Sequence, residues 1–300
     1  MKKWKKILAA VLCLACAQVP VLTGAGTVQV QAAAVKQGLK KESGKYYYYV
    51  KGVRVKNTWK TVSTTKNGKT VTYRYYFGKD GAAYAGKIVN GKTQIAVKKI
   101  SGAYYGFDAY GRMVKGTYLS GSVYRTFSQS TGRMIGIVSE KGKYYYYTGT
   151  KIAKNTFKQV KTTTGTRTYY FGKTGAAYCG KTNAYGEKVP LVTKINSVYY
   201  GFGTTGIMLK GTYVVNGKFC VFSTANGKYD KTQTAKLRTA AKEGTDAAAL
   251  RALLGTPVKT ETMDSCMGDG VDELLYYPNF IVSLFKDKSG KETVLGVISR

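Results

Sequence analysis

The phrase YYFGKDGAAYAGK at residues 75–87 returns almost unchanged as YYFGKTGAAYCGK at residues 169–181. Similar phrases, rich in tyrosine and divided by glycine, fill residues 44–230 and align as two copies, 44–134 and 142–230. Six phenylalanines mark the alignment: Phe77, Phe107 and Phe127 in one copy, and Phe171, Phe202 and Phe222 in the other. Self-similarity at a fixed spacing is typical of stacked repeats. We therefore take the repeat as the unit of the fold.

Each unit has the pattern of a strand, a tight turn and a second strand. Tyrosine and phenylalanine favour a pleated, half-buried surface, and glycine supplies the conformation that hairpin turns need. The predicted turn pairs are Asp80-Gly81, Tyr110-Gly111, Thr131-Gly132, Thr174-Gly175, Thr205-Gly206 and Asn226-Gly227. A lone hairpin is marginal in water, so neighbouring hairpins are expected to stack through their aromatic rings. The sequence predicts a mainly β fold, a solenoid of stacked β-hairpin repeats followed by a small α+β domain.

The charge of the chain is strongly unbalanced. It contains 48 Lys and Arg against 15 Asp and Glu, and it has no histidine. Residues 33–234 hold 35 basic and 6 acidic side chains, whereas residues 235–300 hold nine of each. The excess in the repeats is larger than solubility needs. It favours a polyanionic partner, such as nucleic acid, an anionic lipid surface or a phosphate-bearing polymer.

The first residues decide among these partners. Four lysines in residues 1–6 precede an apolar run at residues 7–17, and small residues follow. This order indicates a secretory signal peptide over residues 1–34, with cleavage after Ala32 or Ala34. The apolar run is shorter than the ~20 residues of a membrane-spanning helix.

The signal peptide places the protein outside the cell. Residues 35–43 are interpreted as a leader, and lipidation of Cys16 is the minor alternative to cleavage at an alanine. We expect a secreted protein of the cell surface or cell wall, with no nucleic-acid partner and no transmembrane segment after signal removal.

Two phrases carry a resemblance to a known family: YYGFDAYGRMVKGTY at residues 104–118 and YYGFGTTGIMLKGTY at residues 199–213. Their order of glycine, methionine and glycine resembles the cell-wall-binding repeats of Gram-positive surface proteins, which include choline-binding and glucan-binding repeats. The matching residues are Gly111, Met113 and Gly116, then Gly206, Met208 and Gly211. The resemblance implies non-covalent attachment to the cell envelope through aromatic side chains.

Ligand contacts follow from this resemblance. Tyrosines stand where the family carries tryptophan, and a tryptophan face is the best partner for a quaternary ammonium such as choline. The ligand stays open among choline, a sugar and an anionic polymer, and the lack of tryptophan favours the last two. The expected ligand-binding residues are Tyr104, Tyr105, Met113, Tyr118, Tyr199, Tyr200, Met208, Tyr213 and Trp59. The units of the opening phrase, with Ala83 and Ala177 at the methionine position, are interpreted as packing units.

The densest mixture of basic and aromatic residues begins each copy. Any single lysine there fits a solvated strand face, but the whole set is expected to pair with the phosphates of a wall polymer while tyrosines stack on its sugars. The expected polyanion-binding residues are Lys45, Lys51, Arg54, Lys56, Lys60, Lys143, Lys151, Lys154 and Lys158.

Residues 235–300 have the pattern of a separate α+β unit. The predicted elements are a helix at 236–243, a second helix from Asp246 to Leu254 ended by Gly255, and strands at 273–277, 280–286 and 292–298. Two helices followed by a β-meander resemble the small domain shared by β-lactamase-inhibitory proteins and the small outer-membrane assembly lipoprotein. The phrase SCMG at 265–268 is also similar to tails of clostridial surface lipoproteins. The likeness implies contact with a protein partner.

Catalytic residues are hard to place in this sequence. The usual base for a serine or cysteine nucleophile is missing because the chain has no histidine. The acidic cluster Asp264, Asp269, Asp272 and Glu273 is interpreted as a solvated loop before a strand, and Cys266 as a buried or inert thiol. Cys179 and Cys220 are interpreted as free, with a disulfide between them left open. We expect no catalytic residue, no metal and no cofactor.

The sequence therefore predicts an exported, non-enzymatic protein that binds an envelope glycopolymer, teichoic-acid-like or glycan, through its repeats. Two alternatives stay open. The repeats are an extracellular carbohydrate-binding or adhesion module, or they are a structural spacer that presents residues 235–300 to a protein partner.

Overall fold

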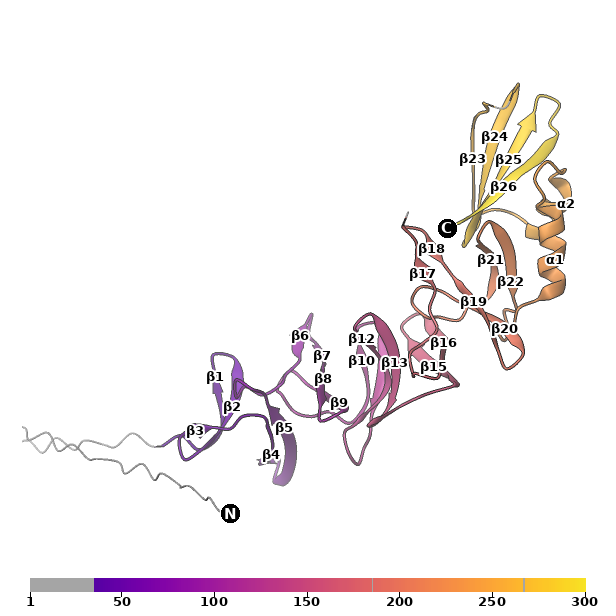
Figure 1. Ribbon diagram of the computed structural model, residues 1–300. Coiled ribbons are helices and arrows are strands. Elements are labelled where there is room, and N and C mark those ends of the chain that lie inside the picture. Colours follow the sequence, from indigo (N-terminus) through magenta and orange to yellow (C-terminus); the bar gives the residue numbers. More distant parts are fainter. Residues whose placement is uncertain (1–34, 185, 267) are drawn as a thin grey trace, which may run out of the picture.

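The computed structural model describes residues 35–300 except 185 and 267. These residues form twenty-six strands and two helices, so the prediction of a mainly β chain is confirmed. Figure 1 shows the hairpins following one another along an elongated, curved path that ends in the C-terminal unit. The expected signal peptide and Cys16 lie outside the described residues.

The repeat region consists of antiparallel hairpins and small sheets. The strands of the first copy are β1 (Gly38–Glu42), β2 (Lys45–Val50), β3 (Val53–Arg54), β4 (Thr58–Lys66), β5 (Lys69–Phe77), β6 (Lys87–Val89), β7 (Lys92–Gln94), β8 (Ala96–Ile100), β9 (Ala103–Phe107), β10 (Gly116–Ser120) and β11 (Val123–Phe127). Those of the second copy are β12 (Met134–Glu140), β13 (Lys143–Thr148), β14 (Lys151–Ile152), β15 (Thr156–Thr162), β16 (Gly165–Phe171), β17 (Lys181–Thr182), β18 (Lys188–Val189), β19 (Leu191–Ile195), β20 (Val198–Phe202), β21 (Gly211–Val215) and β22 (Lys218–Phe222). A seven-stranded sheet containing β10 to β16 joins the two copies.

The expected leader is part of the fold. Residues 38–42 form β1, which pairs along its whole length with the tyrosine-rich strand β2. In the second copy β12 pairs with β13 in the same way, with Glu140 opposite Lys143. Each copy therefore begins one strand before the tyrosine run. The sequence analysis placed the start of each copy at its tyrosine run because the preceding strands, β1 and β12, have little sequence in common.

The hairpin turns lie at other residues than the sequence predicted. Many of them are two-residue turns with both residues at positive φ, among them Ser43-Gly44, Asn67-Gly68, Ser101-Gly102, Lys141-Gly142 and Asn216-Gly217. This is the backbone of the turns whose twist matches a hairpin. The predicted pairs, Asp80-Gly81 among them, follow the second strand of a hairpin instead. The chain reverses at these pairs too, since Thr131-Gly132 lies between the paired strands β11 and β12 and bridges such as Phe77 with Ala83 close over the others. The prediction missed the turns inside the hairpins because both kinds of turn need a residue in the left-handed region.

The segment after each hairpin returns to a preceding hairpin and binds it through the backbone. The amide of Ala83 donates to the carbonyl of Tyr46 at 2.8 Å, and the amide of Met113 donates to that of Arg74 at 2.7 Å. Ala177, Met208 and Tyr229 repeat the contact in the second copy, on Tyr144, Thr168 and Tyr199. All but one of these bonds join hairpins of different sheets, and the exception is the bond from Ala177 to Tyr144, which lies within the seven-stranded sheet.

Gly111 makes this close approach feasible. It has a φ of 79°, and a Cβ atom there would lie 3.2 Å from the side chain of Ala83 on the preceding segment. A larger residue would be strained in this backbone conformation and would also push the segments apart.

The six phenylalanines of the repeat are the centres of its core. Phe77, Phe107, Phe127, Phe171, Phe202 and Phe222 are all fully buried. Tyr75 and Tyr169 of the opening phrase are also buried, and their rings stack on Phe77 and Phe171. The hydrophobic core is thus a series of small clusters distributed along the hairpins, not one central cluster.

The C-terminal unit contains α1 (Lys231–Ala240), α2 (Ala248–Leu254), β23 (Lys259–Asp264), β24 (Gly270–Tyr276), β25 (Phe280–Asp287) and β26 (Glu292–Ser299). Its four strands form a meander in chain order. The N-cap of α2 is Ala247, without a side-chain cap bond, and the predicted cap residue Asp246 lies one position earlier, where its carboxylate accepts from the amide of Ala248 at 2.8 Å. Gly255, at a φ of 69°, ends α2 as predicted.

Two elements of this unit differ from the prediction. Helix α1 begins at Lys231, because Asp230 caps it by accepting from the amide of Gln233 at 2.9 Å. Strand β23 was missed because it is an exposed edge strand without apolar alternation.

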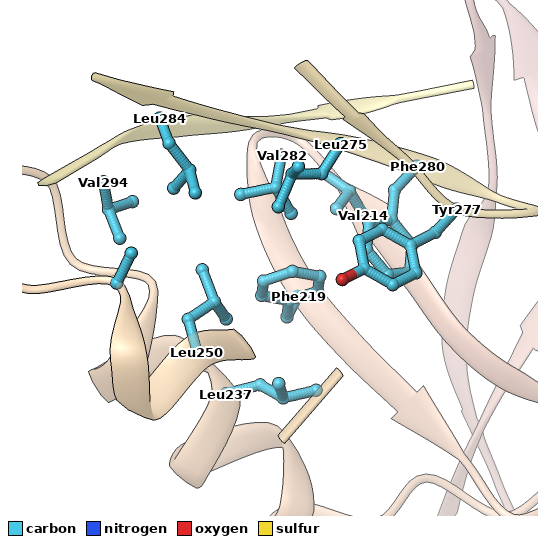
Figure 2. Close-up of a cluster of buried hydrophobic side chains, with 11 residues drawn as sticks. Val214, Phe219, Leu237, Leu250, Leu275, Tyr277, Phe280, Val282, Leu284 and Val294 are labelled. Carbon is cyan, nitrogen blue, oxygen red and sulfur yellow. The ribbon is translucent and has the colours of Figure 1, made fainter. Parts of the chain in front are cut away.

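The core of the C-terminal unit includes the last hairpin of the repeats. Val214 of β21 and Phe219 of β22 are each 1% exposed and pack among Leu237, Leu250 and the inner residues of β24 to β26 (Figure 2). The ring of Phe219 meets that of Phe280 edge to face at 5.1 Å. Hairpin β21–β22 therefore belongs to both parts of the protein, and a cut at residue 235 would expose Phe219.

We expect Phe219→Ala to lower the free energy of unfolding by about 3–5 kcal/mol, because it leaves a cavity in this shared core. The matched control is Tyr124→Ala at the corresponding position of β11, where the ring is only half-buried. Its loss should be about 1 kcal/mol. Urea denaturation measures both values, and equal losses would contradict the shared core.

Candidate functional site

The first cluster of expected ligand residues surrounds Trp59. Strand pairing sets Trp59 opposite Tyr76, and their ring centroids are 5.2 Å apart. Tyr105 of the following hairpin approaches the indole at 4.9 Å, and Met113 packs against the same cluster. The guanidinium of Arg74 lies 4.4 Å from the centroid of Trp59. The structure thus brings together Trp59, Tyr105 and Met113, and the guanidinium of Arg74 occupies one face of the indole.

The second copy builds the equivalent cluster without tryptophan. Phe157 takes the place of Trp59, 4.8 Å from Tyr170 and 5.1 Å from Tyr200. Met208 belongs to this cluster and is 8% exposed.

Both methionines are covered by the hairpin that follows them. A Cβ atom at Gly132 would lie 2.6 Å from Met113, and one at Gly227 would lie 2.5 Å from Met208. The glycines of the next unit therefore make room for the methionines of the previous one. A ligand would reach Met208 only by displacing this hairpin, so in the structure the methionine packs the stack.

Tyr118 and Tyr213 occupy matching places in the two copies. Each meets the buried phenylalanine of its own hairpin edge to face at 6.3 Å, Phe127 and Phe222 respectively. Both tyrosines are half-buried. Burial raises the pKa of Tyr213.

Tyr104 lies in a closed polar site. Its hydroxyl donates to Oε1 of Glu140 at 2.7 Å, and its ring meets that of Tyr147 edge to face at 5.0 Å. Tyr147 and Lys99 donate to the same oxygen at 2.6 and 3.0 Å. Burial and the carboxylate raise the pKa of Tyr104 to about 12, and the hydrogen bonds, that of Tyr147 first, hold the pKa of Glu140 at about 2.

Tyr199, the counterpart of Tyr104, lies open. Its ring is 50% exposed and meets Tyr229 edge to face at 6.3 Å. A cleft of about 980 Å³ lies beside it, between β20, β22 and α1. We call it the junction cleft. Its lining includes Tyr199, Tyr229, Cys220, Lys218, Lys231 and Arg238.

The expected polyanion-binding residues fall into two groups. Six of the lysines are exposed: Lys45, Lys51, Lys56, Lys143, Lys151 and Lys154. Arg54 is exposed too, but it is paired with Glu42 at 2.6 Å and lies over the ring of Tyr47 at 4.0 Å. Lys60 and Lys158 are half-buried over Tyr48 and Tyr146. The first group faces solvent, whereas the second has contacts within the protein.

Sequence reasoning missed several pairs of a cation and a tyrosine. Lys161 lies over Tyr124 at 5.4 Å, and Arg112 lies 4.7 Å from both Tyr73 and Tyr110. Lys41 lies over Tyr46, its cross-strand partner. To predict the Lys41–Tyr46 pair, one must know which residues of β1 and β2 lie opposite each other, and the sequence did not reveal this register.

All six acidic residues of the described repeat region bond within the protein. Each carboxylate accepts at least one hydrogen bond from a neighbouring side chain or amide: Glu42, Asp80, Asp108, Glu140, Glu187 and Asp230. The 35 basic side chains therefore dominate the surface of residues 35–234.

The acidic cluster of the C-terminal unit is not a solvated loop. Glu273 lies in β24, is 7% exposed and binds Arg251 at 2.6 Å, and Arg251 also binds Glu292. The prediction was wrong for Glu273 because Arg251 comes from a distant helix. Asp264 ends β23, and Asp269 is exposed and paired with Lys288.

The three described cysteines are free thiols, so Cys179 and Cys220 do not form a disulfide. Cys266 was expected to be a buried or inert thiol, and it is not buried, because it lies exposed in the connection between β23 and β24. Within residues 35–300, leaving out 185 and 267, no group of His, Cys, Asp or Glu could hold a metal ion. The described helices are too short to cross a membrane.

We expect the Glu140 site to make the free energy of unfolding depend on pH in the acidic range. The pKa of Glu140 lies below its ordinary 4.5, so its contribution is complete above about pH 4.5 and is lost as the pH falls toward about 2. Glu140→Gln should flatten the pH dependence of the unfolding free energy in this interval. Glu187→Gln, at an exposed carboxylate, is the control. If both variants kept the wild-type slope, Glu140 would not carry this contribution.

No family model matches the chain, and no curated protein matches it. Solved structures with similarity to it include CbpJ of Streptococcus pneumoniae TIGR4, at 18% identity over 62% of this chain and 70% of that one, with a TM-score of 0.24. Choline binding protein F of Streptococcus pneumoniae, determined with a peptidoglycan analogue, has 15% identity over 85% and 86% of the two chains and a TM-score of 0.24.

A third similar structure is the pneumococcal cell wall endolysin from phage Cp-1 complexed with choline, at 18% identity and a TM-score of 0.27. The match covers 58% of this chain and 37% of the endolysin. The structural neighbours of the chain thus include choline-binding proteins.

Proposed function

We propose that this protein is a non-enzymatic envelope protein whose repeats bind an anionic glycopolymer of the cell wall, such as a teichoic-acid-like chain. One observation carries the proposal. The repeats combine 35 basic with 6 acidic side chains, and all six acids are engaged within the protein. Few acids are therefore left to balance the exposed lysines, whose positive charge would attract a polymer of regularly spaced phosphates.

Tyrosine rings beside these cations support a polymer that also contains sugars. Tyr110 is 46% exposed, and Arg112 lies 4.7 Å from its ring centroid. An aromatic ring can stack on the apolar face of a sugar while the neighbouring cation binds a phosphate. We propose that the hairpins form a solenoid, along which such pairs would follow an extended chain.

Choline is a less suitable ligand for the Trp59 cluster. A quaternary ammonium needs an open aromatic face, and the guanidinium of Arg74 lies over the indole of Trp59. A choline would have to displace a cation whose charge repels it.

The proposal extends to the location of the protein and to its C-terminal unit. We propose that the protein is exported and that residues 235–300 contact a protein partner, as the resemblance to small inhibitory and lipoprotein domains implies. The shared core at Phe219 and Phe280 supports a fixed attachment of this unit to the last hairpin.

Binding to isolated cell walls tests the polymer. A variant with Lys45, Lys56, Lys143 and Lys154 changed to Gln removes four exposed charges at matching places in both copies. Its matched control changes Lys236, Lys242, Lys288 and Lys291, exposed lysines of the C-terminal unit. We expect the repeat variant to bind walls roughly tenfold more weakly and the control to bind normally, since only the repeats carry the charge excess.

The same assay at low and high salt, on intact walls and on walls stripped of anionic polymer, identifies the ligand. Salt screens exposed charges, so retention should fall at high salt and on stripped walls. Equal retention on both kinds of wall at all salt concentrations would refute the proposal. Retention that resists salt and is lost on adding a neutral glycan would instead support the carbohydrate-binding alternative.

A further inference from the structure

The two copies differ at one corresponding position. In the first copy, hairpin β12–β13 covers Tyr104 and supplies two groups to it, the carboxylate of Glu140 and the ring of Tyr147. Lys99, which pairs with Tyr104 across strands β8 and β9, binds the same carboxylate at 3.0 Å. This site is thus filled by an acid and a ring from the protein itself.

In the second copy no hairpin follows. After β22 the chain turns at Asp230 into helix α1, which lies along β22 (Figure 1). Tyr199 and Lys194 pair across β19 and β20 as Tyr104 and Lys99 do across β8 and β9. The ring of Tyr199 is 50% exposed, and the junction cleft lies where the first copy has its next hairpin.

The lining of the cleft combines positively charged side chains with apolar ones. Lys218, Lys231 and Arg238 line it, and its described lining contains no carboxylate. The side chain of Arg238 is held in place, because Nε donates to the carbonyl of Phe219 at 2.7 Å and Nη2 lies 3.4 Å from the sulfur of Cys220. Cys220 is buried. The cleft thus offers fixed positive charge beside an open tyrosine ring.

We propose that the junction cleft binds an anionic sugar, a ring that carries a carboxylate or phosphate. Such a ligand supplies an acceptor for the hydroxyl of Tyr199 and for Lys218, Lys231 and Arg238. It also places a ring beside that of Tyr199, much as Glu140 and Tyr147 supply an acceptor and a ring to Tyr104 in the first copy. The volume of about 980 Å³ accommodates a ligand of more than one sugar unit. The site is separate from the six exposed lysines of the proposed wall-binding surface.

Titration of the protein with D-glucuronate, D-glucose 6-phosphate and neutral D-glucose, followed by NMR, tests the site. We expect at least one of the two anionic sugars to bind about tenfold more tightly than glucose, a difference of about 1.4 kcal/mol. Tyr199→Ala and the double variant Lys218→Gln/Lys231→Gln should each weaken that binding at least about fivefold. Met263→Ala is the control, because Met263 is similarly exposed at 49% but lies outside the cleft.

Equal binding of glucose and both anionic sugars, or no binding of either anionic sugar, would overturn the proposal. So would full binding by Tyr199→Ala or by the lysine double variant. The wall-binding variant with Lys45, Lys56, Lys143 and Lys154 changed to Gln is titrated in parallel and should bind the anionic sugar as tightly as the unmodified protein, because none of these lysines lines the cleft. Failure of the cleft can therefore be distinguished from failure of wall binding.

Discussion

The backbone hydrogen bond from the end of each unit to a preceding hairpin is the contact on which the rest of the structure depends. Isolated two-stranded hairpins are marginal in water, and most hairpins here share no strand pairing with the next. The amides of Ala83, Met113 and their counterparts connect them. These bonds require the backbones to approach closely, which explains why glycine recurs after each strand pair. The buried phenylalanines fill the space between the hairpins that the bonds hold together.

Stacking also determines which side chains remain available to a ligand. The inner tyrosines, the phenylalanines and both repeat methionines are used for packing. Acidic residues are used as hydrogen-bond acceptors within turns, caps and tyrosine sites, as Glu140 illustrates with three donors on one oxygen. The exposed lysines and half-exposed tyrosine faces are left for solvent. The surface of the repeats is therefore basic because the acidic side chains accept hydrogen bonds within the protein and the lysines remain exposed.

At the end of the repeats a helix replaces the next hairpin. Where another hairpin would be added, Asp230 starts a helix, and the last hairpin contributes Val214 and Phe219 to the core of the C-terminal unit. The replacement covers one face of β21–β22 and leaves Tyr199 uncovered on the neighbouring hairpin. One change of element therefore both attaches the C-terminal unit and forms the junction cleft.

The sequence by itself determined the mainly β hairpins, the phenylalanine spacing, the charge imbalance and the change of composition near residue 235, because these depend on local patterns. It also indicated that α2 begins near Asp246 and ends at Gly255, because these boundaries depend on contacts within a few residues. Only the tertiary structure revealed β1, the edge strand β23, the burial of Met208 and the pairing of Glu273 with Arg251. Each of these depends on a partner distant in the chain, and residue spacing does not specify such a partner.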